Sequence, residues 1–240
     1  MTEKKRYIPD LVTILNLFFG FLAIMKTLHD NYLAAFLFIF VGALFDSLDG
    51  KTARFLDRES SFGKEFDSLA DLITFCAAPA IMVYKIYLNQ LGLFGMGISF
   101  SLLLFGAIRL AEYNSTDEPR QDNKFSGMPV PAAALTIGSF IWFNFTSTGG
   151  HGNTEFVIAL VLIISFLMVS SVPFKPFPKI SFSKNWFITL RSLFVITLFI
   201  LFIIFRGYVL FPVMSLYIVN NIFFWMVNRK DNQYIHYKER

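Results

Sequence analysis

Long apolar runs separated by short polar connections occupy most of this chain. Within each run the apolar residues are continuous and do not alternate with polar ones, which predicts helices and disfavours a β-barrel. Most runs approach the roughly 20 residues that a helix needs to cross a bilayer. The eight candidate helices are Leu11–Leu28, Tyr32–Leu48, Leu69–Leu88, Leu91–Leu110, Val130–Phe145, Phe156–Val172, Trp186–Phe205 and Tyr208–Val227. Because the fifth run is short and the sixth ends at Pro173, six well-formed spans with two weaker ones are the alternative.

The composition of the 240-residue chain places these helices in a membrane. Hydrophobic residues make up 55% of the chain and charged residues 16%, and the mean hydropathy is +0.56. An ordinary soluble domain is more polar, and 31 phenylalanines are hard to bury in one soluble core of this size. We therefore predict an all-α, polytopic transmembrane bundle of about eight spans, surrounded by membrane lipids and without a nucleic-acid partner. The single cysteine, Cys76, excludes an internal disulfide and disfavours a cysteine-based zinc site.

The distribution of positive charge predicts the orientation of the bundle. Of the 21 Lys and Arg residues, all but Lys26, Lys85 and Arg206 lie at the two termini or near the even-numbered connections. By the positive-inside rule, both termini and the connection after the second run face the cytoplasm. The basic N-terminal segment is followed by no small-residue cleavage site, so we expect a retained first span. The expected location is a bacterial inner (plasma) membrane, crossed several times.

Four aspartates lie close together between the second and third apolar runs, where a hydrophobic protein would be expected to avoid them. If helices pass through Phe45–Phe55 and Gly63–Thr74, each helix presents two of the acids on one face. The first face holds Asp46, Asp49, Gly50, Ala53 and Arg54, and the second holds Gly63, Asp67, Asp71 and Thr74. If the two faces oppose each other, the four carboxylates converge.

Convergent carboxylates predict a metal centre. Unneutralised, they would repel one another and take up protons, whereas divalent cations relieve the repulsion. An all-oxygen set favours Mg²⁺ or Mn²⁺ over zinc, and two such ions are the usual arrangement for phosphoryl chemistry. Gly50, Ala53 and Gly63 leave room for a bulky ligand, and Arg54 suits a phosphate. The segment therefore predicts a site for a diphosphate substrate at the membrane surface.

Simpler explanations account for only part of this segment. Asp57, Arg58 and Glu59 are most simply charges of a loop, and a single glycine is more often a helix-packing residue. A cation-coupled transporter could use the acids as an ion pathway. Ion conduction does not need Gly50, Ala53 and Arg54, which disfavours that alternative.

The spacing D-x2-D-G-x2-A-R-x8-G-x3-D-x3-D resembles the signature of the CDP-alcohol phosphotransferase family at all eight positions. The resemblance implies a membrane enzyme with a conserved helical core, in which an acceptor hydroxyl displaces CMP from a CDP-alcohol. It also implies that Asp46, Asp49, Asp67 and Asp71 hold two divalent metal ions, Mg²⁺ or Mn²⁺. Asp71, the last aspartate, would in addition take the proton from the acceptor hydroxyl.

The segment IPDLVTILNLFFG resembles the first helix of the family. Four further segments resemble the members of this family that use L-serine as acceptor and CDP-diacylglycerol as donor, namely FDSLADLITFCAAPA, RLAEYN, KFSGMPVPAAA and LMVSSVPFKPF. Glu112 replaces the usual Arg in RLAEYN, and Ser171 replaces a common Asn in LMVSSVPFKPF. The likeness ends near Phe177, so we expect a family domain over residues 1–177, with a six-helix core. Residues 178–240 would add two transmembrane helices and a cytoplasmic tail.

The remaining candidate residues concern substrate binding. Gly50, Ala53 and Arg54 would contact the CDP group, aided by Gly63. Thr13 and Asn16 could hold the nucleotide, although interhelical hydrogen bonding is equally open. Arg109 and Lys124 are candidates for the serine carboxylate or a substrate phosphate. Arg109 is preferred for serine because its guanidinium pairs with a carboxylate in two places, and a role as a cytoplasmic anchor is its alternative.

Two questions stay open at this level. Glycerol 3-phosphate or inositol phosphate could replace serine as the acceptor, since Arg109 and Lys124 do not exclude an additional phosphate. A homodimer is usual in the family, and Gly92, Gly95 and Gly97 could permit close packing between helices.

Overall fold

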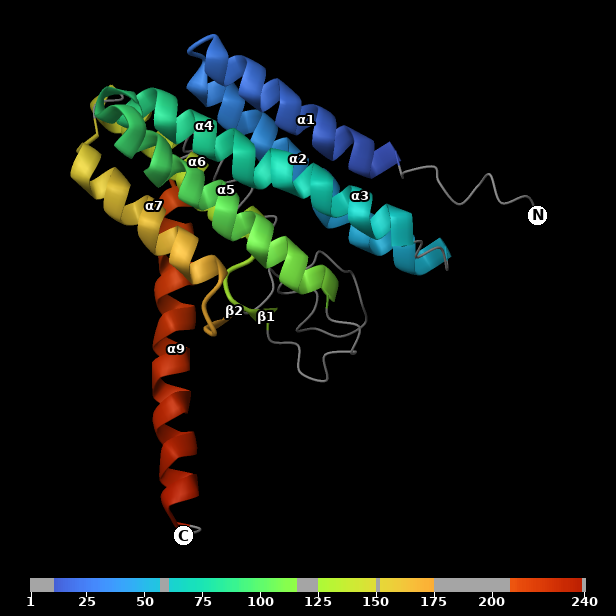
Figure 1. Ribbon diagram of the computed structural model, residues 1–240, viewed down its shortest axis with the longest axis vertical. Coiled ribbons are helices and arrows are strands. Elements are labelled where there is room, and N and C mark those ends of the chain that lie inside the picture. The colour runs from blue at the N-terminus through green and yellow to red at the C-terminus, as the bar shows by residue number, and fades with distance from the viewer. Residues whose placement is uncertain (1–10, 57–60, 116–124, 150–151, 175–207, 239–240) are drawn as a thin grey trace.

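The computed structural model describes residues 11–56, 61–115, 125–149, 152–174 and 208–238 (Figure 1). Helices dominate this part of the chain. They are α1 (Leu11–Leu28), α2 (Tyr32–Leu56), α3 (Ser61–Asp71), α4 (Ala78–Val83), α5 (Gly92–Ser115), α6 (Val130–Thr148), α7 (Thr154–Met168) and α9 (Leu210–Lys238). Figure 1 shows α1, α2, α3–α4 and α5 lying side by side, with α9 extending away from them. The predicted all-α class is confirmed for the described residues, apart from one short strand pair.

Three helical stretches of the described chain are long and apolar enough to cross a membrane. They are Leu11–Leu28, Phe62–Ser115 and Leu210–Val227, and Tyr32–Ser47 and Thr154–Met168 are shorter apolar helices. The predicted run Trp186–Phe205 lies outside the described residues. The protein is therefore an integral, multi-pass membrane protein.

Several predicted helices have different boundaries in the structure. The second continues past its apolar run to Leu56, the third begins at Ser61 instead of Leu69, and the last extends to Lys238 instead of Val227. Hydrophobicity misplaced these ends because the helices extend into polar segments, where periodic hydrophobicity is lost. The third helix is also irregular, since π-helical turns occupy η2 (Leu72–Ala77) and η3 (Tyr84–Leu88) and a 3₁₀ turn, η4 (Asn89–Leu91), precedes α5.

The inward face of α1 is lined by small and polar side chains. The buried residues of this helix are Thr13, Asn16, Gly20, Ala23 and Thr27. Large apolar residues such as Leu11, Phe18 and Phe21 are more than half exposed, as expected for a surface that meets lipid. Small residues let helices approach closely in a membrane, where burial of apolar surface gives no advantage over contact with lipid. This seam brings the polar groups of α1 against the neighbouring helices.

Gly20 on α1 and Gly42 on α2 both pack against Thr74 in η2. A Cβ atom at Gly20 would lie 2.8 Å from the Cα atom of Thr74, and one at Gly42 would lie 2.8 Å from its methyl carbon. Because the Gly20 contact involves backbone, it cannot be relieved by rotating a side chain. The two glycines therefore set how closely α1 and α2 approach the third helix.

We expect Gly20→Val to destabilise the protein by about 1–3 kcal/mol, because overpacking would force α1 away from η2. In detergent, the midpoint of thermal unfolding should fall by roughly 5 °C. Gly97→Val is the matched control, since a Cβ atom there would meet nothing within 4 Å. A Gly20 variant as stable as the Gly97 variant would contradict the close packing of α1 on η2.

A short antiparallel strand pair joins the segments on either side of the α6–α7 hairpin. Strand β1 (Phe125–Ser126) pairs with β2 (Pro173–Phe174), with Phe125 opposite Phe174. Next to the pair, Gly127 has φ of 85° and donates its N–H to the carbonyl of Val172 at 2.8 Å. Two of the segments singled out in the sequence, KFSGMPVPAAA and LMVSSVPFKPF, are therefore structural neighbours.

The C-terminal helix α9 begins against the end of α6. The Tyr208 hydroxyl donates to the carbonyl of Thr146 at 2.6 Å, and the rings of Phe143 and Phe211 lie 5.8 Å apart. Helix α7 packs against α5, where the hydroxyls of Ser101 and Ser165 lie 3.0 Å apart. The later helices are thus joined to the bundle by ring contacts and interhelical hydrogen bonds.

Lys85 links the end of the third helix to the turn between α1 and α2. Its ammonium lies 2.8 Å from an Asp30 carboxylate oxygen and donates to the carbonyl of Leu28 at 2.6 Å. The hydrogen bond from Lys85, with one from Tyr32, holds the pKa of the Asp30 carboxyl below its ordinary value. Lys85, one of the three Lys and Arg residues that lie away from the predicted cytoplasmic face, therefore forms an ion pair with Asp30.

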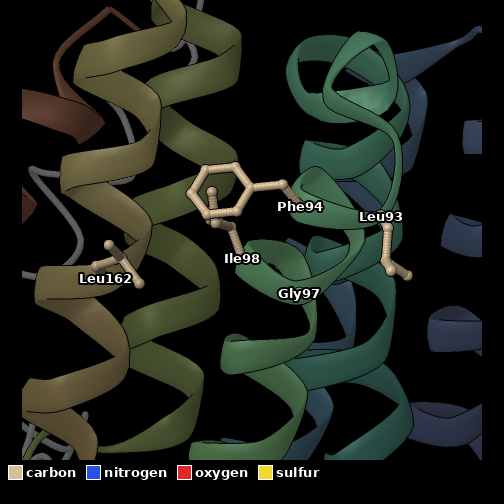
Figure 2. Close-up of a pocket in the computed structure, with 5 residues that line it drawn as sticks. All are labelled: Leu93, Phe94, Gly97, Ile98 and Leu162. Carbon is tan, nitrogen blue, oxygen red and sulfur yellow. The ribbon is translucent and has the colours of Figure 1, made fainter.

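The three glycines considered for dimer packing have different surroundings. Gly92 adopts a positive φ of 55°, and Gly95 lies against the backbone of Leu88. Gly97 faces open space beside an apolar groove between α5 and α7, lined by Leu93, Phe94, Gly97, Ile98 and Leu162 (Figure 2). This groove carries no chemical group suited to catalysis, and hydrocarbon fits its lining.

Candidate active site

Three of the four predicted aspartates converge where α2 meets α3. Asp46 comes from α2, and Asp67 and Asp71 come from α3. One carboxylate oxygen from each lies within 4.8 Å of the other two. Asp46 and Asp67 are half-buried, whereas Asp71 is 8% exposed. The structure thus places two helix faces opposite each other, as the spacing of the acids predicts.

The local structure explains why Asp67 and Asp71 point in the same direction. Asp67 and Asp71 are at positions i and i+4 of α3, which places them on one helix face. The π-helical turn η2 begins directly after Asp71. Such turns are frequent at functional sites, where they adjust the direction of nearby side chains.

The donor set fits a hard divalent cation. Three carboxylates this close in a partly buried site would repel one another strongly without positive charge between them. Carboxylate oxygens are the ligands that Mg²⁺ and Mn²⁺ prefer. Asp46, Asp67 and Asp71 could therefore hold a metal ion, although the geometry does not identify which one.

Several predicted residues fall outside the part of the chain whose side chains the structure describes. Asp49, Gly50, Ala53 and Arg54 lie on the helical backbone of α2, but their side chains are outside that part. Lys124 is outside the described residues altogether. Gly63 is half-buried on α3, one turn before Asp67.

Asn16 makes a direct bond to the cluster from α1. Its side-chain Nδ2 donates to Asp71 Oδ1 at 2.9 Å, and its backbone carbonyl accepts a bond from the Thr74 hydroxyl at 3.0 Å. Asn16 has no exposed surface, and Thr13 on the same face is 4% exposed. The sequence left two roles open for Asn16, nucleotide binding and interhelical hydrogen bonding. In the structure, Asn16 makes interhelical hydrogen bonds.

Thr74, Gly20 and Gly42 were given no site role from the sequence. They form the close contact that brings α1 and α2 onto the helix of Asp71. The signal that could have found Gly20 is the seam of small and polar residues in α1, where spacings of three and four residues interrupt an otherwise bulky apolar run.

Arg109 is buried on α5 beside the third helix. It is 5% exposed, and its Nη1 lies 3.7 Å from Glu112 Oε2. On either side of Arg109 along α5, Asn114 Nδ2 donates to Ser68 Oγ at 2.9 Å, and a Cβ atom at Gly106 would lie 3.2 Å from Cys76 Cβ. These contacts show that α5 runs antiparallel to α3 and η2, and they place Arg109 between the levels of Ser68 and Cys76.

Lys64 and Asn114 fasten the end of α5 to α3. The Lys64 ammonium donates to the backbone carbonyl of Asn114 at 3.2 Å, and the Asn114 amide contacts both Ser68 and Glu65. A cation near the last carbonyls of a helix is favourable because it complements the helix dipole. This network holds the part of α5 that carries Arg109 against the helix that carries Asp67 and Asp71.

Comparison with known proteins places this site in a family. The sequence model described as CDP-alcohol phosphatidyltransferase matches residues 6–177, which include every described element from α1 to β2. The chain belongs to the CDP-alcohol phosphatidyltransferase family. This family is metal-dependent, and the carboxylate cluster lies within the matched region.

Curated relatives in this family cover most of the chain. A CDP-diacylglycerol–serine O-phosphatidyltransferase of Helicobacter pylori is 30% identical over 220 residues, which are 91% of this chain and 90% of that protein. The enzyme of the same name from Bacillus subtilis is 36% identical over 173 residues, or 72% and 92% of the two chains. An archaetidylserine synthase of Methanothermobacter thermautotrophicus is 35% identical over 175 residues, or 70% and 69%. Because the similarity to the H. pylori enzyme covers 91% of this chain, it includes the acidic cluster.

Proposed function

We propose that this enzyme transfers the phosphatidyl group of CDP-diacylglycerol to the hydroxyl of L-serine and releases CMP. The convergence of Asp46, Asp67 and Asp71 carries the proposal, because it is the arrangement that a metal-assisted phosphoryl transfer requires. The choice of serine is supported by the serine O-phosphatidyltransferases of H. pylori and B. subtilis, which resemble the chain over most of its length.

The four aspartates have one shared role in the proposed mechanism. Asp46, Asp49, Asp67 and Asp71 would hold two divalent ions, Mg²⁺ or Mn²⁺, which when bound supply positive charge to the diphosphate and to the departing CMP. Arg54 would bind the diphosphate from α2, while Gly50, Ala53 and Gly63 leave room for the CDP group. Asp49, Gly50, Ala53 and Arg54 take these roles from the family signature.

Asp71 would act as the general base. The serine oxygen attacks the phosphorus of the phosphatidyl group, and the bond from that phosphorus to CMP breaks on the opposite side. The hydroxyl proton passes to an Asp71 carboxylate oxygen as the new bond forms. The products are phosphatidylserine and CMP, and no covalent enzyme intermediate is required.

The assay that tests this function compares acceptors. Purified enzyme is incubated with CDP-diacylglycerol and Mn²⁺ or Mg²⁺, and serine, glycerol 3-phosphate and inositol phosphate are offered separately while CMP is followed. We expect serine to support CMP release. Release with a phosphorylated acceptor and none with serine would reassign the acceptor. Cation-coupled uptake into vesicles without CMP release would overturn the class of function.

Arg109 would bind the carboxylate of serine. Its burial on α5, between the levels of Ser68 and Cys76 on the helix of Asp71, supports this role, because a guanidinium can bind a carboxylate through two hydrogen bonds. Lys124 is proposed as a second cation for serine or for a substrate phosphate.

We expect Arg109→Ala to raise the KM for serine by about 10-fold or more, since hydrogen bonds to charged groups are worth roughly 1.5–3 kcal/mol. The KM for CDP-diacylglycerol should change much less. Initial rates of CMP release measured against each substrate in turn separate the two effects. An unchanged KM for serine would return Arg109 to phosphate binding or to an anchoring role.

We also propose the complete topology of eight spans, with both termini and the acidic cluster in the cytoplasm. Residues 1–177 would form the family domain, and 178–240 would add two helices and a cytoplasmic tail. The direction of the described helices supports this arrangement. The Asn16–Asp71 bond and the Gly20–Thr74 contact show that α1 runs parallel to α3–η2, whereas α5 runs antiparallel to it.

A reporter fused after Arg240 should behave as cytoplasmic. An alkaline phosphatase fusion, which is active only after export, should be inactive, and a green fluorescent protein fusion should fluoresce. The opposite pattern would contradict the proposed topology. A homodimer is proposed as well.

A further inference from the structure

The bond between Asn16 and Asp71 joins α1 to the carboxylate cluster at a fully buried position. A primary amide buried at this depth is unfavourable unless its polar atoms are bonded. Nδ2 donates to Asp71 Oδ1, while Oδ1 of Asn16 is buried and has no hydrogen-bond partner among the described residues. Among the described residues, the bond from Nδ2 to Asp71 is thus the hydrogen bond that the Asn16 side chain makes, and its Oδ1 has no partner there.

The orientation of the amide is set by chemistry. An ionised carboxylate can only accept hydrogen bonds, so the Asn16 nitrogen must face Asp71, and the reverse orientation would place two oxygens together. On the other side, Asn16 Oδ1 points toward α2, where a Cβ atom at Gly42 would lie 3.1 Å from it. The Thr74 hydroxyl fixes the backbone of the same residue. Asn16 is thus held in place by contacts from both neighbouring helices.

A neutral donor suits this position better than a cation. A Lys or Arg bonded to Asp71 would orient the carboxylate, but its positive charge would oppose a divalent ion at the same site. An amide orients one carboxylate oxygen and leaves the negative charge available for the metal. Partners of this kind, behind a metal ligand, commonly fix the direction of the ligand and tune metal affinity.

We infer that Asn16 is a positioning residue, whose amide fixes the Asp71 carboxylate for metal binding and for proton transfer from the acceptor. This inference rests on the proposed function, since it assigns Asp71 those two roles. It replaces nucleotide binding as the role of Asn16, because the side chain is fully buried and is bonded to the acid.

The first measurement is Mn²⁺ binding to the purified protein, followed by electron paramagnetic resonance without either substrate. We expect Asn16→Ala to weaken Mn²⁺ binding by about 10-fold or more. Thr27→Ala is the matched control, because Thr27 is 1% exposed on the same helix but its hydroxyl bonds to Ala23 of that helix. The control should bind Mn²⁺ within about 2-fold of the wild type. Unchanged Mn²⁺ affinity in Asn16→Ala would overturn the inference.

The second measurement is a double-mutant comparison. If Asn16 acts only through Asp71, adding Asn16→Ala to Asp71→Asn should cause no further loss of Mn²⁺ affinity. A second, additive loss would show that Asn16 acts independently of Asp71 and would overturn the positioning role.

Steady-state kinetics at saturating Mn²⁺ separates positioning from nucleotide binding. Positioning predicts a fall in kcat with the KM for CDP-diacylglycerol within about 3-fold, whereas loss of a nucleotide contact would raise that KM and leave kcat intact. If Asn16→Ala does not give a monodisperse protein, Asn16→Leu, which keeps the approximate size of the side chain and adds no charge, answers the same kinetic question. If the wild type releases no CMP with serine, the proposed acceptor fails, while the Mn²⁺ measurements still decide the role of Asn16.

Discussion

Replacing Asp71 with Asn should lower the rate of CMP release by about 10³-fold or more, because a general base alone contributes roughly 10²–10⁴-fold. The substitution keeps the size of the side chain but removes both its charge and its ability to take a proton. Membrane insertion and the thermal unfolding midpoint should change little. Turnover is measured as CMP released from CDP-diacylglycerol and serine at saturating Mn²⁺. Near-normal turnover would refute the role of Asp71 as the base.

Asp30→Asn is the matched control for this experiment. It makes the same chemical change at an acid in the turn between α1 and α2, where Asp30 pairs with Lys85. Since this turn lies at the other end of α1 from the acidic cluster, CMP release should remain within about 2-fold of the wild type. A comparable loss in both variants would point to a general effect of removing an acid.

Removal of divalent metal should abolish CMP release. We expect dialysis against EDTA to lower the rate by at least about 10³-fold, because bound metal supplies several kcal/mol of charge stabilisation in such reactions. Adding Mn²⁺ or Mg²⁺ should restore turnover. EDTA already saturated with Mn²⁺ is the control, and it should leave the rate unchanged. Turnover that persists after complete chelation would contradict the metal centre.

The acidic cluster was predictable from the sequence because it depends mainly on helix periodicity. Asp67 and Asp71 are four residues apart, and Asp46 lies on a helix that must turn back within a short connection. Those two facts suffice to bring the acids to one end of a helical hairpin. The hydrophobic runs likewise predicted the existence of the helices that the structure describes. They placed the end of α2 too early and the start of α3 too late.

The contacts that support the cluster could not be predicted in the same way. Asn16 is 55 residues from Asp71, and periodicity within α1 shows which face Asn16 is on but not what that face meets. The partner depends on how α1 is rotated and shifted against the third helix, which Gly20, Gly42 and Thr74 decide through their sizes.

Arg109 shows a related limit. The charge pattern placed it near the cytoplasmic end of a span, where both an anchor and a ligand for serine were open. Its burial follows from the antiparallel packing of α5, which depends on the Asn114–Ser68 bond and on the close contact at Gly106. Neither contact has a signature in the spacing of charged residues.

The π-helical turn over Leu72–Ala77 divides the third helix into a half that begins at Ser61 and a half that continues from Ala78. Before and within this turn, Asp71 and Thr74 bond to Asn16, whereas Cys76 at its end packs against Gly106 of α5. A π turn is closed by a hydrogen bond between residues i and i+5, so it contains one residue more than an α turn, which is closed between residues i and i+4. Deleting a single residue here would restore α-helical hydrogen bonding across this stretch and rotate one half against the other by about 100°. The extra residue therefore changes the direction of the side chains that follow it. As a result, one helix can direct Asp71 into the catalytic centre and still pack its later residues against α5 within the membrane.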